Sequence, residues 1–202
     1  MARRSDHTRE EIKEMAIIAA ETIVGREGYK GLSARKVAAD IGYTVGTLYL
    51  VFENLNDLII QVNDRTLAEL NEAMKASIDG LDGAQERVLA LSRAYIDFAT
   101  HRTHRWRMIY EHIHPDNTAL PDWYRRRIES MFEPVGREIA VMMPEAAPVA
   151  CRKATHALWC GVHGICILGL TGKLDVAGAD SVRVMVDLLV ENYLRGLLKE
   201  RC

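Results

Sequence analysis

The chain has 202 residues, 49% hydrophobic and 27% charged, which is enough to bury a core as one large domain or two small ones. Its 26 basic and 28 acidic residues give a net charge of −2. This balance excludes the broad basic field expected of a protein that coats nucleic acid without regard to sequence.

Composition also bears on location. No apolar run approaches the roughly 18 residues of a membrane span, and the charged N-terminus is unlike the apolar core of a signal peptide. The four cysteines have neither zinc-like spacing nor a disulfide-rich context, so we expect a protein of the reducing cytoplasm, without membrane contact. Cys160 and Cys166 lie in an apolar stretch and are better explained as small core residues than as redox sensors.

Apolar residues recur at helical spacing along the whole chain, and no strand pattern or internal repeat is present. We predict a first helix ending near Gly28 and a long helix from residue 58 toward residue 77. A linker follows at 80–83, where two glycines flank Leu and Asp. The sequence therefore predicts an all-α fold of about nine helices.

Prolines divide the second half of the chain. Pro115 and Pro121 bracket a loop, and a further helix begins near Asp122. Pro134 is expected to kink or split that helix, because proline lacks a backbone donor and clashes with the preceding turn. Two apolar helices, about 149–172 and 179–199, then close the chain.

Two short helices joined by a tight turn are predicted between residues 31 and 58. Ser33 and Thr44 are suitable N-caps, and Gly42 can end the first helix in the left-handed conformation. Leu48 and Phe52 would turn inward. Such a pair indicates a helix-turn-helix whose second helix enters a DNA major groove. A plain core hairpin is the competing interpretation.

The residue types of the second helix suit DNA contact. Tyr43, Thr44 and Val45 stand at its start, where side chains meet base edges, and a Thr or Val methyl group can contact thymine. The hydroxyls of Thr47 and Tyr49 suit phosphates, which set register without reading bases. Gly46 permits close approach to the sugar-phosphate strand, and Arg35 can reach a phosphate or a guanine edge.

From Ser33 through Leu58 the chain resembles the signature of the TetR family of one-component transcriptional regulators, roughly T-x-R-x-I-A-x-x-A-G-V-S-x-G-T-L-Y-x-Y/H-F-x-x-K-x-x-L. The segment from Thr8 to Ala20 is similar to that family's first helix. The resemblance implies a DNA-binding domain at 1–56 and an effector-binding and dimerisation domain at 57–202.

Two positions depart from the family pattern. Val51 stands where the family commonly has Tyr or His, and Leu55 stands where it favours Lys. Both family residues typically touch phosphate, so we expect weaker binding or substitute contacts, such as a flexible basic N-terminal arm; that terminus can equally be unstructured and without a role. The predicted DNA-binding residues are Arg3, Arg4, Ser33, Arg35, Lys36, Tyr43, Thr44, Val45, Gly46, Thr47, Tyr49 and Asn54.

The last two helices carry broad apolar stripes with small residues that allow close helix approach. In TetR-like proteins these helices form a four-helix bundle across a two-fold axis, and a palindromic operator needs two recognition helices about 34 Å apart. Intramolecular core packing would give the same stripes. The predicted homodimer interface is Ala157, Gly161, Val182, Met185, Val186, Leu189 and Tyr193.

A local W-x-x-x-H-G string places Trp159 and His163 four residues apart on one helix face, similar to a variant signature of some TetR-type ligand-binding domains. These residues and clustered aromatic and methionine side chains can line a cavity for a small-molecule effector. A satisfied core histidine and ordinary core packing are the alternatives. The predicted pocket residues are Tyr95, Phe98, Trp106, Met108, Tyr110, Met131, Phe132, Trp159 and His163.

Four histidines, at positions 101, 104, 112 and 114, lie within fourteen residues. No Cys or Glu ligand motif completes a zinc set with them, so we predict neither a metal nor a cofactor. No P-loop, nucleophile elbow, Rossmann glycine pattern or zincin motif is present, so we predict no enzymatic activity.

The expectation from sequence is a transcriptional repressor that binds double-stranded DNA at a pseudo-palindromic operator and is released by a small apolar effector. Two alternatives remain: an effector-independent architectural DNA-binding protein, and an all-α enzyme of unknown type. Ligand-dependent loss of DNA binding would separate the repressor from the architectural protein.

Overall fold

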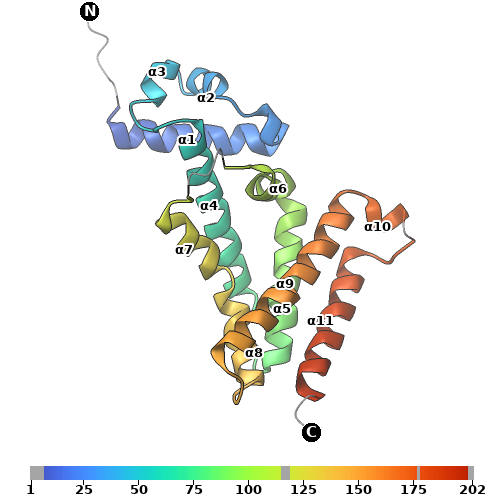
Figure 1. The fold of residues 1–202 in the computed structure, drawn as a ribbon. Coiled ribbons are helices and arrows are strands. Elements are labelled where there is room, and N and C mark those ends of the chain that lie inside the picture. The colour runs from blue at the N-terminus through green and yellow to red at the C-terminus, as the bar shows by residue number, and fades with distance from the viewer. Residues whose placement is uncertain (1–6, 115–118, 177, 200–202) are drawn as a thin grey trace, which may run out of the picture. The chain divides into compact units, whose positions relative to one another are not determined.

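The computed structural model describes residues 7–114, 119–176 and 178–199, and this part of the chain is helical, with no strand (Figure 1). The all-α prediction is confirmed. The helices are α1 (Arg9–Glu27), the 3-10 turn η1 (Tyr29–Gly31), α2 (Ala34–Asp40), α3 (Val45–Leu48), α4 (Leu55–Ala76), α5 (Ala84–His101), α6 (Thr103–Glu111), α7 (Asp122–Ser130), α8 (Glu133–Met142), α9 (Pro148–Leu170), α10 (Lys173–Val176) and α11 (Val182–Lys199).

The chain forms two compact units. Unit 1 spans Met1–Thr66 and Arg102–Tyr124, and unit 2 spans Leu67–His101 and Arg125–Cys202. Helices α4 and α7 therefore each contribute residues to both units. The units differ in their bounds from the functional domains predicted at 1–56 and 57–202, and that division by role stays a prediction.

Unit 1 is built around α1, whose first turn carries a capping box. The Thr8 hydroxyl accepts a hydrogen bond from the Glu11 amide (3.2 Å), and the Glu11 carboxylate accepts one from the Thr8 amide (2.6 Å). Helices α2, α3 and α6 contact α1. The apolar core between them includes fully buried Val24, Val37 and Met108, which fixes the position of the short helices.

Glu21 of α1 ties the unit together by charge. Its carboxylate lies 3.7 Å from a guanidinium nitrogen of Arg65 on α4 and 3.0 Å from one of Arg105 on α6. Because the Glu21 side chain is only 18% exposed, these ion pairs are partly shielded from solvent screening. Three helices of unit 1 therefore converge on one carboxylate.

Unit 2 is a helical bundle in which α5, α8, α9 and α11 pack against one another. The Arg93 guanidinium of α5 donates two hydrogen bonds of 2.8 Å to the Asp187 carboxylate of α11, the paired geometry that suits these groups. Arg87 of α5 and Glu138 of α8 form another ion pair, at 2.8 Å. Figure 1 shows α9 and α11 side by side.

The helix boundaries follow the sequence prediction at Pro134 and differ from it between α5 and α6. Pro134 stands in the first turn of α8, so it splits the predicted helix into α7 and α8 as expected. The break between α5 and α6 was not predicted: Arg102 leaves the helical conformation (φ −120°, ψ 35°) in a segment that has no Gly or Pro to mark a break. In the described part of the chain, no helix is long and apolar enough to cross a membrane.

Candidate functional site

The tight turn between α2 and α3 has the hydrogen bonds of a Schellman motif. Gly42 has φ +73°, which lets the chain reverse at the end of α2 without a Cβ penalty. The Tyr43 amide donates to the Ala38 carbonyl (2.9 Å) and the Gly42 amide to the Ala39 carbonyl (3.2 Å). This turn sets the direction in which α3 leaves α2.

Both short helices are capped as the sequence predicts. The Ser33 hydroxyl accepts from the Lys36 amide (3.3 Å), and the Thr44 hydroxyl accepts from the Thr47 amide (3.2 Å). Leu48 is buried in the core with Phe52, which anchors α3 by its inner side. Helix α3 is thus held at its start and along one face, and its other face is open.

The predicted DNA-binding residues differ in how much side chain they leave available. Exposed members are Arg35, Lys36, Thr44, Gly46, Tyr49 and Asn54; half-buried members are Ser33, Tyr43, Val45 and Thr47. Arg3 and Arg4 lie outside the described residues. The described members of the set lie in one part of unit 1, around α2, α3 and the start of α4.

Several of these polar groups already have partners. The Tyr43 hydroxyl lies 2.7 Å from Nδ1 of His7, and the Asn54 side-chain oxygen accepts from the Asp57 amide at 3.0 Å. The Lys36 ammonium group donates to Glu27 and lowers the pKa of that carboxyl. In contrast, the side chains of Arg35 and Tyr49 have no hydrogen-bond or ion-pair partner among the described residues. These two side chains are available for a ligand.

The packing of Val51 and Leu55 gives a physical reason for their departure from the family pattern. Both are half-buried and pack against the core of unit 1. Each therefore adds apolar contact beneath α3 in place of a polar group at the surface. Leu50, between them and α3, is 64% exposed; sequence reasoning missed it, because a single exposed leucine carries no periodic signal.

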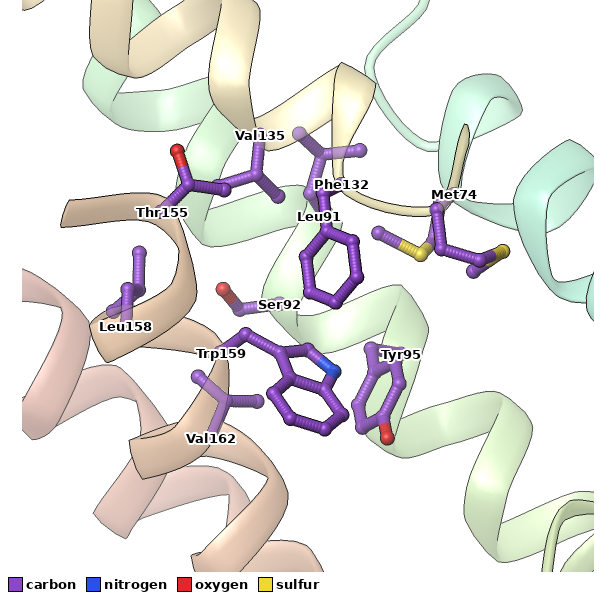
Figure 2. A pocket seen from close by; sticks show the side chains of 11 residues that line it. Met74, Leu91, Ser92, Tyr95, Phe132, Val135, Thr155, Leu158, Trp159 and Val162 are labelled. Atoms are coloured by element: carbon purple, nitrogen blue, oxygen red, sulfur yellow. The ribbon is translucent and has the colours of Figure 1, made fainter. Parts of the chain in front are cut away.

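Unit 2 contains a small apolar cavity of about 40 Å³ (Figure 2). Four of the predicted pocket residues line it: Tyr95, Met131, Phe132 and Trp159. Its other lining residues, which the sequence prediction missed, are Met74, Leu91, Ser92, Val135, Thr155, Leu158 and Val162. Most of these are aliphatic, and an aliphatic residue at helical spacing has no feature that separates cavity lining from core.

A ladder of aromatic rings runs along this cavity. The Phe132 and Trp159 rings meet edge to face with centroids 5.5 Å apart. Trp159 and His163 are stacked, with centroids 4.8 Å apart and planes at 17°, and His163 Nδ1 lies 2.8 Å from the Tyr95 hydroxyl. Figure 2 shows the Phe132, Trp159 and Tyr95 rings around one space. The helical spacing of Trp159 and His163 thus produces the shared face that the sequence predicts.

The remaining predicted pocket residues do not line the cavity. Trp106, Met108 and Tyr110 lie on α6 in unit 1, where Trp106 and Met108 are completely buried and Met108 belongs to the core beneath α3. Phe98 of α5 is half-buried outside the cavity lining. Aromatic clustering along the sequence therefore mixed residues of two separate cores.

Several of the predicted dimer residues have packing partners within the chain. Val186 is completely buried within the chain, and the Tyr193 hydroxyl donates to the Ala154 carbonyl of α9 (2.8 Å). Gly161 lies directly under Leu189, and a Cβ at Gly169 would fall 2.1 Å from Val182. These contacts are the intramolecular packing that the sequence left as an alternative. Met185 is half-buried, and Ala157 is exposed.

In the described residues, no group of three or more His, Cys, Asp or Glu side chains is placed to hold a metal ion. Nδ1 of His104 lies 3.0 Å from the Gly25 carbonyl, and His112 Nε2 lies 3.1 Å from the Asn56 side-chain oxygen. His101 Nδ1 lies 2.7 Å from the Asp97 carbonyl. Three of the clustered histidines are thus engaged with other parts of the protein.

The geometry defines a class of protein: an α-helical chain with a helix-turn-helix and a separate bundle that contains a cavity. Residues 88–193 match the family described as "Tetracyclin repressor-like, C-terminal domain". Because this match takes in more than half of the chain, the chain belongs to the TetR family of transcriptional regulators. The match does not overlap the helix-turn-helix, where the sequence resemblance lies.

Solved structures share the fold. A protein of unknown function from Rhodococcus sp. RHA1 is 20% identical, with a TM-score of 0.77 over 97% of this chain and 99% of that one. A TetR-family transcriptional regulator from Streptomyces coelicolor is 14% identical, with a TM-score of 0.68 over 95% and 88%. RolR in complex with resorcinol is 13% identical, with a TM-score of 0.67 over 93% and 87%. No curated protein sequence matches the chain significantly.

Proposed function

We propose that the chain is a sequence-specific transcriptional repressor that binds a pseudo-palindromic operator as a homodimer and leaves it when a small-molecule effector enters unit 2. The observation that carries the proposal is the capped helix α3 beside two exposed side chains, Arg35 and Tyr49, that have no partner among the described residues. A guanidinium and a phenol so placed suit DNA phosphates and guanine edges.

The effector part of the proposal is supported by the aromatic cavity of unit 2. Its lining is apolar and drawn from α4, α5, α8 and α9 and the turn before α8, and apolar cavities with a few polar groups are typical ligand sites. A structural neighbour, RolR, is bound to resorcinol, which supports a small molecule as the effector here. For release, the effector must bind the DNA-free conformation more tightly than the DNA-bound one.

The homodimer is supported by the outward faces of α9 and α11. Ala157 and Leu168 are exposed on α9, and Val184 and Leu188 are exposed on α11. Cys160 is also exposed on α9, so its prediction as a core residue was wrong. The apolar members Leu168, Val184 and Leu188 are 45–54% exposed, and exposed apolar stripes of this kind mark association surfaces. We therefore propose that this outward stripe, and not the buried one, forms the dimer surface. A DNA-binding regulator of this kind acts in the cytoplasm.

Selection of operators from random duplex DNA by the full-length chain tests the proposal. We expect enriched sequences to contain two inverted half-sites about one helical turn, ~34 Å, apart. Arg35→Gln should weaken binding, and Tyr49→Phe should weaken all selected operators alike if the hydroxyl touches phosphate. Arg126→Gln, at an exposed arginine of unit 2, is the matched control. Failure to enrich any inverted repeat, or equal losses for Arg35→Gln and the control, would contradict the proposal.

A further inference from the structure

The aromatic cavity of unit 2 is separated from a second, larger hollow by two side chains. An outer groove of about 800 Å³ runs along α8 and the first half of α9, with Glu129 of α7 at one end. Phe132 and Thr155 line both the groove and the inner cavity. They therefore form the wall between a small interior space and an open one.

The inner cavity has polar atoms, but they are already bonded within the protein. The Ser92 hydroxyl donates to the Val88 carbonyl (2.9 Å), and the Thr155 hydroxyl donates to the Cys151 carbonyl (2.9 Å). The Tyr95 hydroxyl is paired with His163. No charged side chain lines this cavity. A ligand group that enters it is therefore uncharged, because burial of an unpaired charge is very costly.

The outer groove, in contrast, has charged groups. Arg152 and His156 stand one turn apart on α9, and Arg152 has no ion-pair or hydrogen-bond partner among the described side chains. Arg137 also lines the groove, with Glu133 3.4 Å away as its partner. Glu129 supplies a competing negative charge on α7.

Position favours Arg152 and His156 of α9 over Glu129 as the ligand's polar anchor. The His156 ring meets the Phe132 ring edge to face, with centroids 4.7 Å apart. Arg152 lies four residues before His156, on the same helix face. The His156 ring therefore lies at the wall between groove and cavity, and the Arg152 cation lies one helical turn before it, where the polar end of a half-inserted ligand would remain.

Phe132 lies between the two hollows. At about 40 Å³ the inner cavity holds a few water molecules at most, whereas an engineered apolar cavity that binds benzene in another protein measures about 150 Å³. Phe132 is half-buried and lies in the turn between α7 and α8, directly before the first residue of α8. Because Phe132 lines both hollows, rotation of its side chain would change the opening between them.

We infer that Phe132 is a gate and that the effector is an amphipathic anion. Its aryl or alkyl part enters the aromatic cavity as Phe132 turns aside, and its carboxylate or similar head binds Arg152 and His156 in the groove. This inference rests on the proposed function, which makes the cavity the effector site. It also refines that proposal, since the effector is apolar only at one end.

Three probes that share one tail test the charge of the head: 4-phenylbutyrate, 4-phenylbutan-1-ol and 4-phenylbutylamine, titrated calorimetrically into the full-length chain. We expect the acid to bind at least about tenfold more tightly than the alcohol, as a charge-assisted contact requires. The amine should bind most weakly. Equal or tighter binding of the alcohol or amine, or no binding of any probe at millimolar concentration, overturns the inference.

Matched variants test whether Arg152 binds the charged head of the ligand. Arg152→Gln should reduce the preference for acid over alcohol to within about threefold, since the contact that distinguishes the two probes is lost. Lys153→Gln removes the neighbouring exposed cation, which does not line the groove, and should leave the preference unchanged. Equal effects of the two substitutions would show that the preference is only a long-range effect of net charge, and would overturn the assignment.

Stopped-flow mixing tests the gate. Phe132→Ala should raise the association rate constant of 4-phenylbutyrate several-fold, and Phe132→Trp should lower it, because the side chain at the wall shrinks or grows. Phe132→Leu replaces the alanine variant if a thermal melt shows that the latter is unfolded. Phe98→Ala, at a half-buried ring outside both hollows, is the control. A wild-type rate constant in the folded Phe132 variant overturns the gate.

Operator binding separates this inference from the proposed function. If the acid binds with the expected preference but leaves a selected operator bound, the repressor mechanism fails and the assignment of the ligand class holds. If the neutral alcohol releases the operator as effectively as the acid does, the mechanism holds and the ligand class is wrong.

Discussion

Tyr95 of α5 and His163 of α9 are joined by a contact of 2.8 Å between the phenol oxygen and Nδ1 of the imidazole. Trp159 covers one face of that imidazole, and burial lowers the pKa of His163 below its usual value of about 6.5. The neutral ring can accept the phenol proton at Nδ1. Protonation of His163 would remove this acceptor and leave a charge beside the aromatic cavity.

The first prediction concerns stability against pH. Because the pKa of His163 is lowered in the folded chain, the unfolded chain binds a proton more readily, so the contribution of His163 is complete above about pH 6.5 and is lost as the pH falls through the lower folded pKa. We expect the midpoint of thermal unfolding to decrease between pH 7 and pH 5, and His163→Gln to make that decrease smaller.

His112 provides the comparison for this experiment. Its pKa is also lowered, first by burial and then by the nearby charge of His114, so its linkage has the same sign but acts in unit 1. His112→Gln should therefore flatten the pH profile in part, and the double variant should flatten it further. A double variant with the pH profile of the wild type would refute this account.

The second prediction concerns the affinity for DNA and its dependence on salt. Leu55→Lys restores a cation at the start of α4, where the family pattern has one, and each added phosphate contact should steepen the dependence of log K on log salt by about 0.9. Leu55 packs against the core of unit 1, so the same change should lower the stability of that unit. Leu55→Met, which keeps the apolar contact, should alter neither property. An unchanged salt slope for the lysine variant would mean that position 55 does not face a phosphate.

Local features of the fold could be predicted from the sequence. Ser33 and Thr44 cap their helices because a side-chain oxygen needs only the amide three residues onward. Gly42 reverses the chain through its own backbone freedom, and Trp159 stacks on His163 through one helical turn. Each of these relationships joins residues a few positions apart, so the sequence contains all of the information that determines it.

Relationships between helices could not be predicted in this way. Met108 is apolar and close in sequence to other aromatic residues, yet it packs in the core beneath α3 and not in the cavity. Val186 belongs to an apolar stripe, but a stripe looks the same whether the surface it meets is its own chain or a second copy. The packing of α9 against α11 determines which face of each helix points outward. That packing depends on the whole folded bundle, so the sequence pattern alone does not show it.

The third prediction uses that outward face. Leu188→Arg places a charge in the middle of the exposed stripe on α11, where Leu188 is 54% exposed, and should convert the dimer to a monomer at micromolar concentration. Operator affinity should then fall, because two linked recognition helices bind far more tightly than one. Sedimentation of the full-length chain measures the first effect. Val141→Arg, at a 63% exposed valine of α8, is the control, and a Leu188→Arg protein that sediments as a dimer would contradict the proposed surface.

The fourth prediction concerns the close approach of α9 to α11. A Cβ at Gly169 would lie 2.1 Å from Cγ2 of Val182, a stiff β-branched side chain at the first residue of α11. Gly169→Ala should therefore lower the free energy of unfolding by about 1–3 kcal/mol, the usual cost of overpacking. At Gly161 the obstructing atom is Cδ2 of Leu189, 2.7 Å away, and the flexible leucine can rotate, so Gly161→Ala should cost less.

Gly25 supplies the control for these two substitutions, since it lies inside α1 with open space around the position of a Cβ. Alanine there should stabilise the chain by roughly 0.5–1 kcal/mol through helix propensity alone. Urea denaturation of the three variants ranks them by the room at each site: Gly25→Ala most stable, then Gly161→Ala, then Gly169→Ala. If Gly169→Ala gains as much stability as Gly25→Ala, α11 can move away from α9 at little cost. The packing of α9 against α11, which leaves the apolar stripe on the outer face, would then be weaker than these contacts imply.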